Sequence, residues 1–347
     1  MRLQAFWRRM REVKAGPAPD VTTKPDGTLH SVKLEAWTDQ LIMPHAVSSK
    51  IIRRANSLEA AYRRSGQLFH LTDKEREALQ SVRTGVSLMR IDTEHQADEI
   101  AAAVHDEYPW MAEATDALWQ DLRRSVRRGD AGFRFTPILL DGPPGIGKSS
   151  WARYVAGQVR VPSLAIDASA EAAGFGIVGV QRGWSSAQSG QPVALILREH
   201  VGNPMVVIDE IDKTGTIHGA SGVAHSLQNS LLPLLEPSTA KAWTCPFYRV
   251  SMDMSWISWI LTANDAGLVP TPLRSRCREL RLRRLTTAEL VAITLREQRR
   301  RGLSDPATEG IVGALQETAS SPVQPDLRIL SRMLDLAERH DALPMVH

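Results

Sequence analysis

Short apolar runs alternate with longer helical stretches through the middle of the chain. Four runs have the length of buried strands and end in polar or glycine residues: "FTPILLDG", "SLAID", "PMVVIDE" and "SWILTAN". Strands that alternate with helices in this way are typical of a parallel sheet covered by helices. The pattern therefore predicts an α/β domain with a parallel central sheet.

The flanks of this region have different patterns. Proline and glycine punctuate residues 15–30, whereas helical periodicity runs from residue 34 to about 128, where Thr72 and Glu75 have the spacing of a helix capping box. Amphipathic periodicity also fills the chain after residue 286. We expect a flexible N-terminal arm, a helical N-terminal domain, the α/β domain and a helical C-terminal domain, over residues 1–33, 34–112, 113–285 and 286–347.

Composition adds few constraints. The chain has 347 residues, 43% of them apolar, and a formal net charge of +3, which argues neither for nor against a polyanionic partner. Cys245 and Cys277 are too few for a disulfide framework. The N-terminus lacks the apolar run of a secretory signal, and no stretch of 18 apolar residues occurs. We expect a cytoplasmic protein with no membrane association.

The segment "GPPGIGKS" has the spacing of a phosphate-binding loop, the Walker A motif, directly after an apolar run. Its glycines let backbone N–H groups turn toward phosphates at the start of a helix. Lys148 is expected to contact the β and γ phosphates of ATP, and Ser149 to hold Mg²⁺. The residues expected to bind the nucleotide are Gly142, Pro143, Pro144, Gly145, Ile146, Gly147, Lys148, Ser149 and Ser150. The alternative is a chance glycine-rich turn.

The run "PMVVIDEID" ends in adjacent carboxylates about sixty residues after Ser149. If this strand faces the nucleotide, Asp209 would bind Mg²⁺ through water and Glu210 would polarise the attacking water. The alternative is that these carboxylates, with Asp212, only solvate a strand end. Asn264 closes the run "SWISWILTAND" and could orient the attacking water from a strand between those of Lys148 and Asp209. Its alternative is a turn residue.

In order and rough spacing, these motifs resemble the AAA+ ATPases, and within them the ATPase module of Lon-type proteases. The resemblance covers about residues 113–338 and rests on "GPPGIGKSS", "VVIDEIDK", "SLLPLLEPSTAKAWTCPFYRVSMDMSWISWILTAN" and "PTPLRSRCREL". In the Lon family a Ser-Lys protease domain follows the helical lid, whereas this chain stops at His347. We therefore expect a Lon-like ATPase without protease activity.

The resemblance also implies roles for arginines. It aligns Arg276 with the arginine finger, which acts on the γ-phosphate of an adjacent subunit, and it implies an oligomeric ring, expected to be a hexamer. Arg274 could be a second contact, and Arg328 in "PDLRIL" matches the lid arginine that senses the γ-phosphate in its own subunit. The alternatives are a solvated helix arginine for Arg328 and a nucleic-acid contact for the whole run "LRSRCRELRLRRL", which lacks interleaved aromatic residues.

The segment "GIVGVQRGWSSAQSGQ" corresponds to the Lon pore loop, with Trp184 at its aromatic position. Ser185 and Ser186 stand where the family has an aliphatic residue and a glycine. A ring of such aromatics can grip an extended protein client, although Trp184 could instead pack against its own domain. The expected function is an ATP-hydrolysing motor that remodels proteins. The alternatives are a nucleic-acid-associated ATPase resembling clamp loaders and a nucleotide-controlled scaffold for a partner protein.

Overall fold

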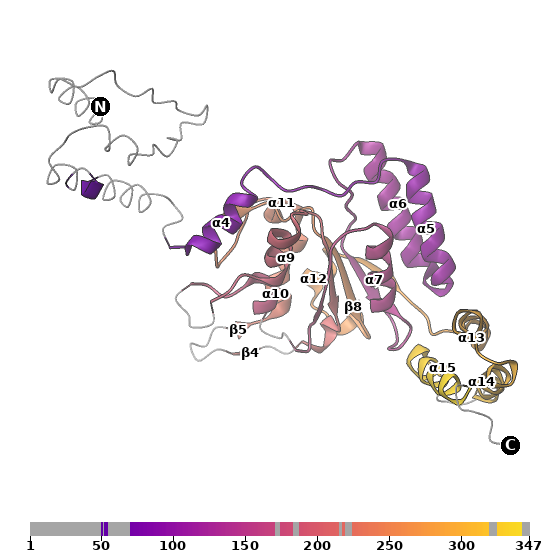
Figure 1. Ribbon diagram of the computed structural model, residues 1–347. Helices are drawn as coiled ribbons and strands as arrows, with labels where there is room; N and C mark the ends of the chain where they lie inside the picture. The colour runs from indigo at the N-terminus through magenta and orange to yellow at the C-terminus, as the bar shows by residue number, and fades with distance from the viewer. Residues whose placement is uncertain are drawn as a thin grey trace. The chain divides into compact units, whose positions relative to one another are not determined.

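A computed structural model of the chain describes residues 50, 52–54, 70–170, 174–182, 187–214, 217–218, 224–318 and 325–341 (Figure 1). The chain divides into two compact units, Met1–His70 and Leu71–His347. All elements discussed below belong to the second unit. Among the described residues, no helix combines the length and apolar character needed to cross a membrane.

Five parallel strands form the central sheet in the order β2-β3-β8-β1-β9. They are β1 (Ile138–Asp141), β2 (Ser163–Asp167), β3 (Met205–Asp209), β8 (Ser258–Ala263) and β9 (Arg278–Arg281). The four predicted strands are confirmed as β1, β2, β3 and β8. The expected place of the Asn264 strand is also confirmed, because β8 pairs with β1 on one side and with β3 on the other.

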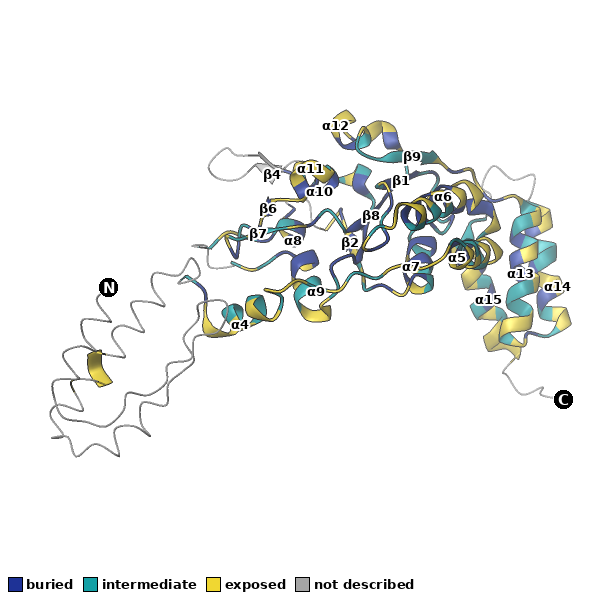
Figure 2. Ribbon diagram, turned by 90° about the horizontal axis from the view of Figure 1, so that it is seen from above, coloured by how far each residue is buried: buried dark blue, intermediate teal, exposed yellow. Residues whose placement is uncertain are grey.

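The central strands are buried on both faces, as expected for parallel strands that helices cover. All residues of β8 are buried, and so are the first four of β3 (Figure 2). Two short antiparallel hairpins lie outside this sheet. They consist of β4 (Ile217–His218) with β5 (Ala224–His225), and β6 (Trp243–Thr244) with β7 (Ser251–Met252). Trp243 and Trp259 are buried.

Helices precede, connect and follow the strands. The α-helices before residue 286 are α4 (Asp73–Ser81), α5 (Glu94–Glu107), α6 (Ala112–Arg128), α7 (Lys148–Gln158), α8 (Phe175–Val178), α9 (Gln191–Glu199), α10 (Leu227–Leu235), α11 (Pro237–Ala240) and α12 (Thr271–Arg274). The short 3₁₀ turns are η1 (Pro109–Met111), η2 (Ile211–Lys213) and η3 (Ala266–Leu268). After residue 286 come α13 (Thr287–Arg301), α14 (Asp305–Glu317) and α15 (Leu327–Asp341). The predicted capping box of Thr72 and Glu75 is present at the start of α4.

The structure differs from the predicted domain boundary at residue 112. Helices α5 and α6 lie on both sides of that position, and they bury Ile100, Val104 and Leu118 in the same apolar core as Trp151 of α7. The Trp151 indole also donates a hydrogen bond to Thr115 Oγ1, at 3.1 Å. The apolar faces of α5 and α6 therefore complete the α/β core, and the contact boundary lies instead between residues 70 and 71.

Asp121 ties α6 to the amino ends of two strands. Its side chain is only 2% exposed, and it accepts hydrogen bonds from the backbone N–H of Thr136, at 3.1 Å, and from the guanidinium groups of Arg124 and Arg278, at 2.7 and 3.1 Å. Thr136 leads into β1 and Arg278 begins β9. One buried carboxylate thus fixes the helix against the sheet edge.

Replacing Asp121 with Ala should lower the free energy of unfolding by about 3 kcal/mol, because it leaves two guanidinium groups and a backbone N–H without their acceptor. Asp116→Ala is the matched control, since Asp116 lies on the exposed side of α6 and, within the part of the chain that the structure describes, accepts a hydrogen bond from Gln120 alone. It should change stability by less than about 0.5 kcal/mol. Urea unfolding followed by circular dichroism measures both. Equal effects of the two substitutions would contradict the assignment.

Candidate nucleotide-binding site

The loop between β1 and α7 has the geometry of a phosphate-binding loop. It follows the carboxyl end of β1 at Asp141, and α7 begins at Lys148, so its N-terminal N–H groups face the loop. Gly145 and Gly147 have φ angles of +76° and +92°, in the left-handed region that favours glycine. The predicted strand, loop and helix therefore occur in the required order.

Lys148 lies inside this loop and is buried. Its Nζ donates to the carbonyl oxygens of Gly142 and Pro143, at 2.5 and 3.0 Å, and to Oδ1 of Asn264, at 3.1 Å. Burial lowers the pKa of Lys148 to about 8, although nearby carboxylates, first among them that of Asp212, favour the charged form. The structure thus brings together two residues, Lys148 and Asn264, that are 116 positions apart in the chain.

Asp209 receives two hydroxyl groups on one carboxylate oxygen. Ser149 Oγ donates to Asp209 Oδ1 at 2.5 Å, and Thr262 Oγ1 donates to the same atom at 3.1 Å. Hydroxyl and carboxylate oxygens are the hard donors that Mg²⁺ prefers, and Mg²⁺ usually takes only one or two protein ligands besides water and phosphate. Ser149 and Asp209 therefore fit the predicted metal site.

Glu210 lies next to Asp209 in a constrained backbone conformation. Its φ of 57° is left-handed, which is uncommon for a residue other than glycine, and its N–H donates to Thr262 Oγ1 at 3.1 Å. The Glu210 carboxylate pairs with Lys213 at 2.7 Å. The backbone thus leaves the extended conformation of β3 at Glu210.

Asp212 and Thr262 have positioning roles that the sequence alone does not reveal. Asp212 Oδ2 accepts the backbone N–H groups of Asn264 and Asp265, at 3.1 and 3.3 Å, which anchors the end of β8. Thr262 bridges Asp209 and the Glu210 backbone. A signal for Thr262 is its spacing: it lies two residues before Asn264, so both point to the same face of the strand.

Two aromatic residues that precede α6, Tyr108 and Trp110, lie beside the phosphate loop. They were not predicted as part of the site, because the predicted α/β domain begins only at residue 113. Trp110 is buried and its Nε1 donates to the carbonyl oxygen of Ile146 at 2.8 Å. Tyr108 packs edge-on against Trp110 and Tyr154, with ring centroids 5.5 and 5.6 Å apart. These rings form an apolar wall beside the start of α7.

The start of α15 meets the same loop. The Leu327 N–H donates to the carbonyl oxygen of Gly145 at 2.9 Å, and a Cβ added at Gly145 would lie 1.9 Å from Asp326 Oδ2. Arg328 follows directly and is exposed. The C-terminal helices therefore reach the phosphate loop, whereas the γ-phosphate role of Arg328 stays a prediction.

Arg276 lies at the opposite edge of the sheet from the phosphate loop. It precedes β9, whose first residue Arg278 is in register with Ile138 at the start of β1, whereas the loop follows the end of β1. Four residues of strand, about 13 Å, separate the two edges. In this structure Arg276 donates to the Pro272 carbonyl at 2.7 Å and pairs with Glu236 at 3.6 Å. It is not brought to Lys148 of its own chain.

The remaining arginines of the run 273–285 are largely paired. Carboxylate partners, in addition to Glu236 for Arg276, are Glu279 for Arg274 and Arg281, Asp121 for Arg278, and Glu289 for Arg283. This pairing leaves little free positive charge for a nucleic acid. Trp184 of the predicted pore loop lies outside the described residues.

Gly145→Ala should weaken nucleotide binding at least tenfold, because the new methyl group collides with Asp326 and alanine disfavours the left-handed backbone. Gly157→Ala on α7 is the matched control, since a Cβ there meets nothing within 4 Å, and it should leave binding unchanged. Titration with a fluorescent ATP analogue measures both. Unchanged binding by the Gly145 variant would show that the loop does not need this conformation.

Comparison with known proteins agrees with this geometry. Residues 138–285 match the AAA family, the "ATPase family associated with various cellular activities". The chain is 26% identical over 204 residues to Lon protease 4 of Sorangium cellulosum and 25% identical over 253 residues to the mitochondrial Lon protease homolog of Drosophila melanogaster. These matches cover 59% and 73% of this chain but only 25% and 24% of the relatives. A Lon protease of Magnetococcus marinus is 32% identical over 45% of this chain and 19% of its own length. Residues 138–285 are therefore similar to the AAA ATPase family, and the chain spans at most about a quarter of the length of these Lon proteases.

Proposed function

We propose that this chain hydrolyses ATP and uses the energy to remodel protein clients within a ring of identical subunits. The observation that carries the proposal is the meeting of Lys148, Ser149, Asp209 and Asn264 at the carboxyl edge of three adjacent strands. Such an edge is where nucleotides bind in open α/β sheets. The roles below rest on this arrangement.

Each residue has a distinct task in phosphoryl transfer to water. Lys148 and the N–H groups of the loop bind the phosphates, and Asn264, anchored through Asp212, orients the attacking water. Glu210 accepts the proton that the water loses as its oxygen attacks the γ-phosphorus. Ser149 and Asp209 would hold Mg²⁺, which when bound offsets negative charge on the phosphates.

The position of Arg276 supports action between subunits. A guanidinium at the amino edge of the sheet is on the wrong side to reach phosphates at the carboxyl edge of its own chain. It can reach those of a neighbour if successive subunits place opposite edges face to face, as in a closed ring. We propose that six subunits form this ring, in keeping with the resemblance to Lon proteases.

Lys148→Ala should lose ATP binding, whereas Arg276→Ala should bind ATP normally and hydrolyse it about 10³-fold more slowly, because the charge on the γ-phosphate is left uncompensated. A mixture of the two variants should recover part of the turnover, since the Lys148 variant still supplies Arg276 to a neighbour. Steady-state phosphate release measures this. Absence of any recovery, with mixed assembly shown by sedimentation, would contradict action between subunits.

Glu210→Gln should bind ATP and turn it over at least about a hundredfold more slowly, as expected when a general base is lost. It should therefore retain a protein client that can be recovered by affinity purification and identified by mass spectrometry. Adding Trp184→Ala to this variant should abolish the capture while ATP binding persists. Capture that is unaffected by Trp184→Ala would refute the pore-loop assignment.

Strong stimulation of ATP turnover by DNA or RNA, lost at high salt, would instead favour a nucleic-acid partner.

A further inference from the structure

A cavity of about 420 Å³ lies at the amino edge of the sheet, away from the phosphate loop. Its walls come from the C-terminal turns of α6, the segment 130–137 that leads into β1, the junction of α10 and α11, and the residues before and at the start of β8. Arg276 also lines it. We call this space the arginine cavity. Its volume is within the range of natural binding pockets.

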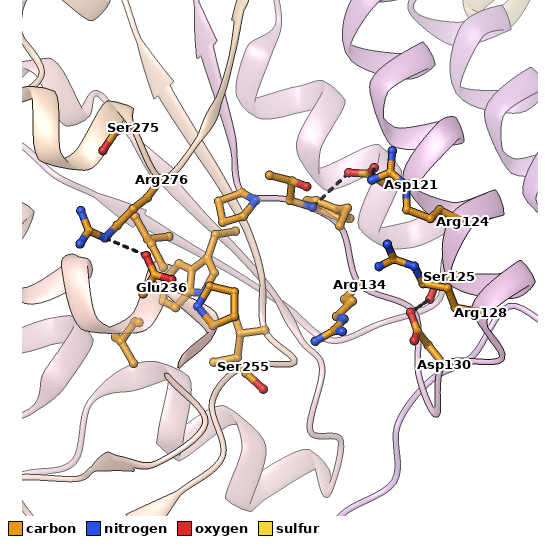
Figure 3. Close-up of a pocket in the computed structure, with 18 residues that line it drawn as sticks. Asp121, Arg124, Ser125, Arg128, Asp130, Arg134, Glu236, Ser255, Ser275 and Arg276 are labelled. Carbon is orange, nitrogen blue, oxygen red and sulfur yellow. Dashed lines mark hydrogen bonds and ion pairs between the residues drawn. The ribbon is translucent and has the colours of Figure 1, made fainter. Parts of the chain in front are cut away.

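Guanidinium groups surround the mouth of the arginine cavity. Figure 3 shows Arg124, Arg128 and Arg134 on one side, together with Asp121 and Asp130, and Arg276 with Glu236 on the other. Asp130 accepts a hydrogen bond from Ser125. Arg124 pairs with Asp121, but Arg128 and Arg134 have no carboxylate within ion-pair distance among the residues that the structure describes. Arg134 lies over the ring of Trp256, 5.0 Å from its centroid. Two cations are therefore available to an incoming carboxylate.

Part of the lining of the arginine cavity is apolar, and we call this part its floor. Buried Leu234, Leu235, Ile257 and Trp259 line it. An occupant that matches both the floor and the mouth would present an apolar side chain next to a carboxylate.

The opposite edge of the sheet presents this combination. The turn Asp265–Leu268 directly follows Asn264. The side chain of Leu268 is 66% exposed, and among the large apolar residues that the structure describes only Leu336, at 67%, is more exposed. Asp265 is also exposed, and its Oδ1 accepts the Gly267 N–H at 2.8 Å. The Ala266 N–H donates to Asp141 Oδ1 at 2.9 Å, which holds the turn against β1. We call Asp265–Leu268 the knob.

We propose that the knob of one copy of this chain enters the arginine cavity of the next copy. Leu268 packs on the apolar floor, and Asp265 pairs with Arg128 or Arg134. The two surfaces differ and lie on opposite edges, so the contact is heterologous and can repeat around a ring. The inference rests on the proposed function and deepens it: docking the knob beside Arg276 brings that arginine toward the neighbour's nucleotide edge.

Two variants of the full chain test the contact. In the knob variant, Asp265→Asn keeps the oxygen that accepts the Gly267 N–H but removes the charge, and Leu268→Ser removes the apolar group. In the cavity variant, Arg128→Glu and Arg134→Glu replace the two positive charges at the mouth of the arginine cavity with negative charges. All proteins in this test also carry Glu210→Gln, and assembly is measured by sedimentation velocity in the presence of ATP. Each variant should need at least a tenfold higher protein concentration than the parent to assemble. Arg198→Glu, an exposed reversal on α9 outside both surfaces, should assemble like the parent.

Mixing the two variants gives the decisive result. The knob variant keeps an intact cavity and the cavity variant keeps an intact knob, so each mixed pair can form one sound interface and no more. The mixture should therefore yield heterodimers but not larger rings. Retained ATP binding and an unchanged thermal midpoint show that both variants are folded.

Normal rings from either variant, or a mixture that stays monomeric, would overturn the docking while leaving the ATPase proposal intact. If the parent binds ATP but never assembles at any concentration tried, both the docking and the ring fail. If the parent does not bind ATP, the proposed function itself fails.

Discussion

The placement of β8 between β1 and β3 is the constraint on which the site depends. Parallel neighbours end at the same edge of a sheet, so the loop after β1, the carboxylates after β3 and Asn264 after β8 must meet. The hydrogen bonds from Lys148 to Asn264 and from Ser149 to Asp209 are the direct result. A different strand order would leave the same motifs dispersed, with no common phosphate site.

The same sheet separates Arg276 from the nucleotide of its own chain. Because β9 starts at the amino edge, where Arg276 precedes it, the strand length itself stands between the guanidinium and the phosphate loop. An arginine that completes the chemistry from there must do so for another molecule. If Arg276 acts as proposed, hydrolysis requires assembly. The cavity beside Arg276 and the partly apolar turn Asp265–Leu268 at the other edge are the two surfaces proposed for that contact.

Helix α5 and the turn η1, which precede residue 112, are part of this architecture. Trp110 bonds the carbonyl of Ile146, and the apolar faces of α5 and α6 fill the core against α7. The start of α15 approaches the same loop through Leu327 and, directly before it, Asp326. Two segments far apart in the sequence therefore contact the phosphate loop, one at Ile146 and one at Gly145. A substitution that moves either segment should change the conformation of the loop.

Local patterns by themselves determined four of the five strands of the central sheet, the phosphate loop, the capping box at Thr72 and the helices after residue 286, because each depends on periodicity or spacing within about fifteen residues. The predicted place of the Asn264 strand, between those of Lys148 and Asp209, is confirmed by the strand order. Only the tertiary structure decided that α5 and α6 belong to the core, since an amphipathic helix does not reveal which surface covers its apolar face. The tertiary structure likewise decided three contacts: Asp212 with the Asn264 backbone, Asp326 with Gly145, and Asp121 with Arg278 of β9. The paired residues lie far apart in the sequence, and no local pattern indicates that they meet.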